Sequence, residues 1–287
     1  SWPLKIVAGV TEDASGETNT SAYIAVGVWH HWLLCSDRSF VRKFWPIVRR
    51  SLDFVVGMQL PWGGISWSQE WTSTGPEGVP AKVNEEALLA GSSSIYQSLR
   101  AGAALAELMG DPQPEWELAG GRLGHALREH RDLFMDKSTF SMDWYYPVLG
   151  GAVRGEPAFE LLATRWDDFV MPGLGIRCVD TNPWVTGAET CELVMSLDAL
   201  GDRERALELY SDMQHLRGER GRYWTGSVHP EHVMWPNEQT SYTAAAVILA
   251  ADELSRTTPG GGIMAGDTLA DHFAELGQDC GCHQARV

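Results

Sequence analysis

Apolar positions recur at helical spacing along most of the chain, and the apolar–polar alternation of strands is nearly absent. Several of these segments are separated by short turns, each of which ends one helix and caps the next. The turns are Ser36-Asp37, Gly110-Asp111-Pro112 and Gly201-Asp202. We therefore predict an all-α chain. The predicted helices are 19–35, 38–59, 91–109, 113–135, 143–152, 154–170, 184–200, 202–216 and 239–256.

The connections between the predicted helices alternate in length. The first, third and seventh helices are followed by tight turns, whereas the return connections run to roughly 15–30 residues, longer than most loops in compact domains. A tight turn between two helices makes an αα-hairpin, and repeated hairpins arranged in a ring make an (α/α)6 toroid whose long loops gather at one mouth. Long ordered loops usually carry function, so we expect the chemistry at that mouth.

A short phrase recurs and supports a repeated architecture. Residues 59–67 (QLPWGGISW) and 214–224 (QHLRGERGRYW) both run from a helix-ending Gln through a Gly-containing turn to an aromatic or apolar residue and a Trp. The opening Ser1-Trp2-Pro3 aligns with the end of this phrase. The pattern predicts a toroid that is incomplete at the N-terminus, with about a hairpin and a half missing before Ser1. We predict a toroid domain over 1–258, and a linker and weakly ordered tail over 259–287.

Charge and composition exclude several partners. The 287 residues carry a net charge of −16, which argues against nucleic acid and anionic membranes, and no apolar run approaches a membrane span. The five cysteines lack a disulfide framework spacing, and three of them (Cys35, Cys178 and Cys191) lie in apolar context, which indicates reduced core thiols and a cytoplasmic protein. The sequence leaves the oligomeric state open, with a homodimer among the alternatives.

Acidic residues stand near each predicted helix start that follows a long loop. Carboxylates are favoured in first turns by the helix dipole and by capping, so each one alone has a plain structural explanation. The set is more informative, because the preceding loops are rich in Trp and Tyr. The acids are Glu17, Glu85, Glu86, Asp143, Glu189 and Glu238.

Carboxylates and aromatic rings that lie together at one mouth of a toroid are suited to binding carbohydrate. Rings stack on the C–H faces of sugars, and carboxylates accept hydrogen bonds from hydroxyl groups. The sequence therefore predicts an oligo- or polysaccharide substrate. The predicted substrate-binding residues are Asp13, Glu17, Asn19, Trp67, Trp144, Tyr145, Asp180, Trp184 and Trp235.

The same residue types suit glycosidic hydrolysis, which uses one carboxylic acid to protonate the leaving oxygen and a second carboxylate as base or nucleophile. A carboxyl beside Trp is desolvated, which raises its pKa and fits it for acid catalysis near neutral pH. Glu189, beside the Trp184 loop, is the leading catalytic candidate, followed by Glu238 and then Asp143 as a partner. We predict no metal site and no cofactor, because the sequence lacks a helical H-x-x-x-H pair, a P-loop and a dinucleotide fingerprint.

Several strings resemble a known family. NTSAYIAVGVWHHW (19–32), DWYYPVLGG (143–151) and PWVTGAETCELV (183–194) are similar to an actinobacterial family of six-hairpin toroids, often labelled prenyltransferases. That family includes the mycobacterial methylmannose polysaccharide hydrolase. The resemblance covers residues 1–258 and implies endo-hydrolysis of an intracellular, methylated α-1,4-mannan without a cofactor, with Glu189 in the matching string. It also implies an acid on a first inner helix that precedes Ser1.

Two alternatives come from other classes of protein. Isoprenoid cyclases and transferases also use α/α toroids, but they need an acidic motif for diphosphate–Mg²⁺ or for protonation. Asp167-Asp168 is the adjacent Asp pair in the chain, and its helical context predicts that it faces solvent. The second alternative is a non-catalytic sugar-binding protein.

Overall fold

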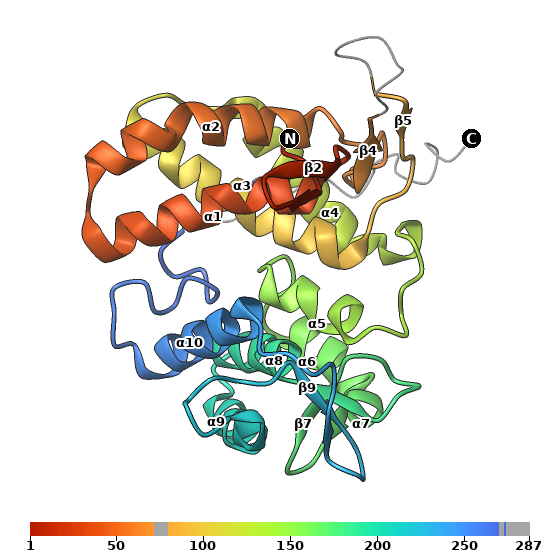
Figure 1. The fold of residues 1–287 in the computed structure, drawn as a ribbon. Coiled ribbons are helices and arrows are strands. Elements are labelled where there is room, and N and C mark those ends of the chain that lie inside the picture. The colour runs from red at the N-terminus through yellow and green to blue at the C-terminus, as the bar shows by residue number, and fades with distance from the viewer. Residues whose placement is uncertain (72–79, 270–272, 274–287) are drawn as a thin grey trace. The chain divides into compact units, whose positions relative to one another are not determined.

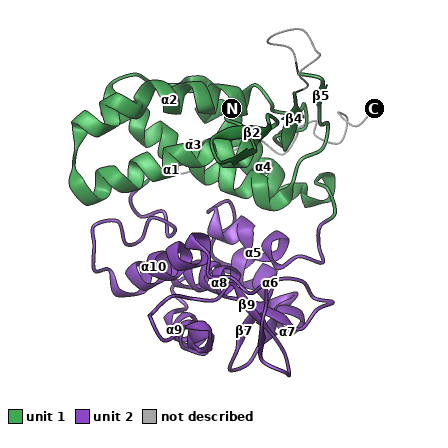
Figure 2. Ribbon diagram, viewed as in Figure 1, with its two compact units in different colours: residues 1–136, 269–287 green, residues 137–268 purple. Residues whose placement is uncertain are grey.

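The computed structural model describes residues 1–71, 80–269 and 273. The chain divides into two compact units (Figure 2). Unit 1 is Ser1–Asp136 with Leu269–Val287, and unit 2 is Lys137–Thr268. Each is a group of packed helices with small sheets at helix ends, as the ribbon in Figure 1 shows. Among the described residues no helix is both long and apolar enough to cross a membrane.

Unit 1 contains two αα-hairpins, and the tight turns predicted from the sequence close both. Ser36 is left-handed after the first helix, and the Asp37 side chain then accepts hydrogen bonds from the backbone N–H groups of Ser39 and Phe40. Gly110 closes the second hairpin with a φ of 69°. The elements are α1 (Thr18–Cys35), α2 (Arg38–Val56), α3 (Leu89–Met109), α4 (Pro114–Glu129) and η1 (Arg131–Leu133). Helix α3 packs against α1 and α4, and it is buried on nearly every side.

Unit 2 is built around α8 (Gly187–Ala199), which packs against α5, α9 and α10. All but two of its residues are buried, because neighbouring helices surround it. The other helices are α5 (Ser141–Leu149), α6 (Glu156–Ala163), α7 (Trp166–Phe169), α9 (Arg203–Asp212), η2 (Met213–Leu216) and α10 (Ser241–Ser255).

Three antiparallel sheets were not predicted from the sequence. In unit 2 the strands are ordered β10-β9-β8-β7-β6, and in unit 1 they form the sheets β3-β4-β5 and β1-β2. The strands are two to four residues long, too short to show alternation. They are β1 (Lys5–Val7), β2 (Val10–Asp13), β3 (Gly16–Glu17), β4 (Ser68–Glu70), β5 (Lys82–Val83), β6 (Val170–Met171), β7 (Gly175–Arg177), β8 (Trp184–Thr186), β9 (Gly226–Val228) and β10 (Val233–Met234).

The recurring phrase forms the same loop in both full copies. An isolated antiparallel bridge closes each one, Gln59 with Ile65 and Arg217 with Tyr223. Each copy is followed by an antiparallel pair of strands and then by the start of a helix. The same order, β1-β2 and later α1, follows Ser1-Trp2-Pro3. In the first copy Gly63 has a φ of 102°, and a Cβ there would lie 2.8 Å from the carbonyl oxygen of Arg122. The loop is therefore repeated in the structure, but in a register that matches Gln59 with Arg217 and Ser66 with Trp224.

Three predicted helices differ from the structure, and the first of them, 113–135, ends as α4 at Glu129 and continues only as η1. The segment 154–170 is two short helices, because the chain turns at Thr164-Arg165 and then enters β6. The segment 184–200 begins as β8, so its helix starts only at Gly187. In these last two segments pairing with a neighbouring strand overrides local helical preference.

The cysteines correct one expectation. Cys191 is buried as predicted, but Cys178 is half-buried and Cys35 is exposed; all three are free thiols. Residues 259–268, within the predicted linker and tail, lie against the end of α10. There the backbone N–H groups of Gly262 and Ala265 donate to the Glu253 carboxylate at 2.9 and 3.1 Å. The rest of the predicted tail, with Cys280 and Cys282, lies outside the described residues apart from Leu269 and Phe273.

Candidate active site

Glu189 lies in the first turn of α8, where β8 leads directly into the helix. Thr186 is extended at the N-cap, and the Gly187 N–H donates to the Thr225 carbonyl at 3.0 Å. A carboxylate in this turn is stabilised by the positive end of the helix dipole. The side chain is half-buried, so it lies at the boundary between the core of unit 2 and solvent.

Glu192 is a buried carboxyl that the sequence did not mark as a candidate. It lies three residues after Glu189, on the same face of α8, and is only 7% exposed. Three tyrosine hydroxyls donate to its carboxylate: Tyr145 at 2.5 Å, Tyr242 at 2.8 Å and Tyr146 at 2.9 Å. The i, i+3 spacing of two glutamates in an otherwise apolar helix is the signal that could have found it.

The tyrosines come from different helices, so the network joins three of them. Tyr145 and Tyr146 lie on α5, Tyr242 lies in the first turn of α10, and Glu192 lies on α8, which packs against both helices (Figure 1). Side chains from three helices therefore converge on one buried carboxyl. Tyr145, predicted to bind sugar, is fully buried in this network, so its ring offers no stacking surface.

Burial, and then the charge of Glu189, raise the pKa of Glu192 to about 7 against the opposing effect of the three tyrosine hydrogen bonds. Burial also raises the pKa of the Cys178 thiol to about 12, with the Glu189 carboxylate as the next cause. Glu189 thus lies between a neutral thiol and a carboxyl that holds its proton to near-neutral pH. Carboxyls in such different environments are typical of acid–base sites.

Glu238 and Asp143 lie beside the same region. Thr225, whose carbonyl accepts from the first residue of α8, also donates its backbone N–H to the Glu238 carbonyl at 3.2 Å. The Glu238 side chain is exposed. Asp143 is in the first turn of α5, and the preceding Ser141 N–H donates to the Cys178 carbonyl at 2.9 Å. Unit 2 therefore holds all three predicted catalytic carboxylates on segments that contact one another.

The predicted aromatic residues of unit 2 fall into two groups. Trp184 and Trp235 form an edge-to-face pair with ring centroids 4.9 Å apart, and the Trp184 indole N–H donates to the Trp235 carbonyl at 2.7 Å. Trp235 is 54% exposed, so this pair can present a ring to a sugar. Trp144 is only 4% exposed and stacks on Phe169 in the core, so its ring cannot bind sugar in this structure.

Asp180 forms an ion pair through one of its two carboxylate oxygens, Oδ2. Arg165 donates to it at 2.6 Å and to Asp168 at 2.5 Å. The arginine thereby holds the loop after β7 to the start of α7. Both acids of the Asp167-Asp168 pair are exposed, as predicted.

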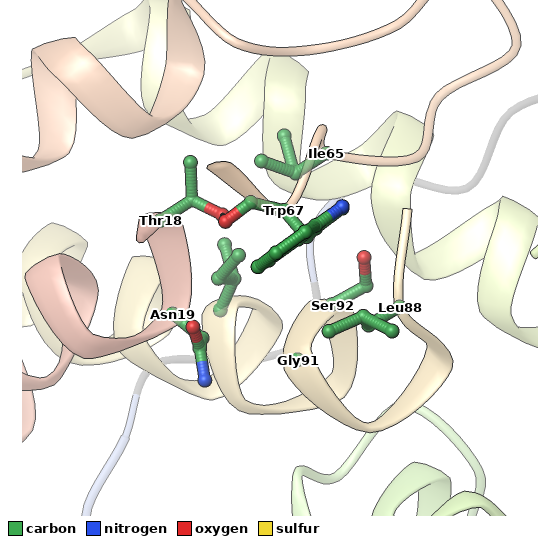
Figure 3. Close-up of a pocket in the computed structure, with 8 residues that line it drawn as sticks. Thr18, Asn19, Ile65, Trp67, Leu88, Gly91 and Ser92 are labelled. Carbon is green, nitrogen blue, oxygen red and sulfur yellow. The ribbon is translucent and has the colours of Figure 1, made fainter. Parts of the chain in front are cut away.

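The candidates of unit 1 gather around the start of α1. Asn19 and Trp67 line a small pocket with Thr18, Leu88 and Ser92 (Figure 3). Its empty volume of about 150 Å³ is smaller than typical ligand pockets. Glu17 precedes α1, and its pKa is raised by burial and then by the Asp13 charge. Asp13 accepts a hydrogen bond from the Ser15 N–H, which lowers its own pKa.

Comparison with solved structures defines the class of fold. A D-mannose isomerase matches with a TM-score of 0.63 and 10% identity, over 88% of this chain and 74% of that one. A sugar epimerase from a ruminal bacterium gives 0.58 and 12%, over 90% and 76%. A family 8 endoglucanase from Klebsiella pneumoniae gives 0.52 and 9%, over 96% and 90%. The chain has the mainly helical (α/α)6-toroid fold class, as predicted.

Sequence comparison defines the family. No protein-family model matches the chain. It is 55% identical over 282 residues to the MMP endo-(1,4)-3-O-methyl-alpha-D-mannosidase of Mycolicibacterium hassiacum, covering 98% of this chain and 76% of the relative. The chain belongs to the family of that enzyme and is a glycoside hydrolase. The predicted family is confirmed; nothing in the comparisons supports the prenyltransferase label.

Metal binding has no support in the part of the chain that the structure describes. Within it, no group of three His, Cys, Asp or Glu side chains could hold a metal ion. The His229 and His232 rings lie 4.5 Å apart between β9 and β10, and burial lowers the pKa of His229.

Proposed function

We propose that this chain hydrolyses internal bonds of an α-1,4-linked mannan that carries methyl groups, with Glu189 as one of two catalytic carboxyls. The observation that carries the proposal is the position of Glu189, half-buried at the start of α8 and three residues before a second, buried carboxyl, that of Glu192. The named activity of the 55% identical relative supports the substrate. We further propose a cytoplasmic location, which the three free thiols among the described residues support.

The second catalytic carboxyl is proposed to be Glu238 or Asp143. Both lie on segments tied to the start of α8 or to Cys178 beside it. Glu192 is a poor candidate for direct chemistry, because both of its oxygens accept hydrogen bonds from buried tyrosines. Retaining and inverting hydrolysis differ in carboxyl separation once substrate is bound, so product stereochemistry is the measurement that distinguishes them.

Incubation with methylated mannan tests the proposal directly. We expect shorter methylated oligosaccharides of mixed length, detected by size separation and mass spectrometry, because an endo-hydrolase cuts within the chain. Unmethylated mannan serves as the comparison substrate. Binding without cleavage would favour the non-catalytic sugar-binding protein. Magnesium-dependent turnover of a prenyl diphosphate would favour the cyclase, although the exposure of Asp167 and Asp168 already argues against it.

The Trp184–Trp235 pair is proposed as a stacking surface for the sugar. Methyl groups on mannose add apolar area, which an exposed indole covers well. Replacing Trp235 with Ala is expected to raise KM about tenfold with little change in kcat, since loss of one stacking contact costs about 1.4 kcal/mol.

Phe159→Ala is the matched control for this variant. Phe159 is a 38% exposed aromatic residue on α6, and its truncation is expected to leave KM unchanged. If Trp235→Ala and Phe159→Ala have the same KM as the unmodified protein, Trp235 does not contact the substrate.

A further inference from the structure

Glu192 has an environment that differs from that of the other buried glutamate in unit 2. Glu253 is 1% exposed, and its charge is balanced by Arg256 at 3.1 Å and by two backbone N–H donors. Glu192 is bonded by three neutral phenols, and among the described residues no Lys or Arg pairs with it. A buried carboxylate without a cation is costly, so this site favours the protonated form.

The groups that face Glu192 leave Glu189 as its charged neighbour. On α5 these are Tyr145 and Tyr146, on α10 Tyr242, on α8 Glu189 and Cys191, and after β7 Cys178. Burial raises the pKa values of Tyr145, Cys191 and Cys178, so these three are neutral at physiological pH. The carboxylate next to Glu192 is that of Glu189, one helical turn away.

The tyrosine cage can hydrogen-bond Glu192 in either protonation state. A phenol hydroxyl can donate or accept, so the network remains satisfied whether Glu192 is ionised or protonated. A Lys or Arg in the same place would fix the ionised form. The network also ties α8 to α5 and α10 at the level of Glu189, which fixes the position of that side chain.

We propose that Glu192 is a positioning residue for Glu189: buried without a cation in its cage of three tyrosines, it carries a proton of the glutamate pair and holds α8 against α5 and α10 at the level of Glu189. This inference rests on the proposed function only where it concerns catalysis. The location of the proton is a property of the protein without substrate. When Glu192 ionises, a negative charge appears beside Glu189.

The first experiment follows carboxyl titration by infrared absorption of the substrate-free protein. We expect a protonated carboxyl that ionises near pH 7 in the unmodified chain and is missing in Glu192→Gln. Tyr242→Phe is the second variant, since its ring is 55% exposed and tolerates the change. Loss of its hydroxyl removes a donor to the ionised form, so the titration moves upward by about one pH unit.

The second experiment compares pH profiles of kcat/KM on methylated mannan. The unmodified enzyme is expected to show a transition near pH 7 that Glu192→Gln abolishes and Tyr242→Phe moves to higher pH. Glu253→Gln is the matched control, because it changes a buried glutamate eleven residues further along α10 from Tyr242, about 16 Å away. It is expected to lower stability while leaving the transition in place.

Each outcome decides the inference. A carboxyl that titrates near pH 7 and survives in Glu192→Gln overturns the assignment of the proton. A titration that disappears in Glu192→Gln while the pH profile stays the same overturns the positioning role and leaves a structural one. An inactive chain whose Glu192 titrates as expected contradicts the proposed function but supports the location of the proton.

Discussion

Replacing Glu189 with Gln is expected to lower kcat on methylated mannan by about 10²- to 10⁴-fold, the range typical of a lost general acid or base. The amide keeps the size of the side chain but can neither give up nor accept the proton. KM is expected to change little, because Gln still accepts and donates hydrogen bonds to sugar hydroxyls. Initial rates of reducing-end formation measure the effect, and circular dichroism checks that the fold is kept.

Two further glutamates provide the comparison for this variant. Glu231→Gln removes an exposed carboxylate from the loop between β9 and β10 and is expected to leave kcat unchanged. If Glu238 is the second catalytic carboxyl, Glu238→Gln is expected to lower kcat as strongly as Glu189→Gln. If Asp143 is the second carboxyl instead, Asp143→Asn is expected to have that effect. Full activity of Glu189→Gln would refute the proposed role of Glu189.

Replacing Trp144 with Ala is expected to lower the free energy of unfolding by about 3–5 kcal/mol, as for other large-to-small changes in a core. The indole is 4% exposed, stacks on Phe169 with centroids 5.3 Å apart, and donates its N–H to the Leu161 carbonyl at 3.1 Å. Its removal leaves a cavity in the core of unit 2 and deletes this hydrogen bond. Urea denaturation followed by circular dichroism measures the loss.

This variant also separates the two roles considered for Trp144. A core residue affects stability and leaves KM unchanged for the folded fraction. Replacement of a sugar-binding residue raises KM and leaves stability unchanged, as we expect for Trp235. Trp144→Phe keeps most of the ring volume and is expected to cost clearly less than Trp144→Ala. A Trp144→Ala variant of unchanged stability and raised KM would restore the prediction made from the sequence.

Local signals were sufficient to locate most helices. Apolar periodicity gave the bodies of the helices, and Ser36-Asp37 and Gly110 gave the hairpin turns, because capping and left-handed geometry are properties of a few adjacent residues. Helix-start acids such as Glu189 were found in the same way. The five-stranded sheet of unit 2 was not found, since its strands of two or three residues are stabilised by partners up to about 45 residues away in sequence.

The sequence by itself determined the helical hairpins, the repeated loop and the family of this chain, because each rests on short-range patterns or on residue identity. The tertiary structure alone decided which aromatic residues are available to a sugar and which carboxyl is buried. Trp144 and Trp235 both follow acidic or polar loops. Only tertiary packing places Trp144 on Phe169 in the core and leaves Trp235 exposed. Glu192 became a candidate only when α5 and α10 brought three tyrosines to it, because desolvation depends on neighbours far along the chain.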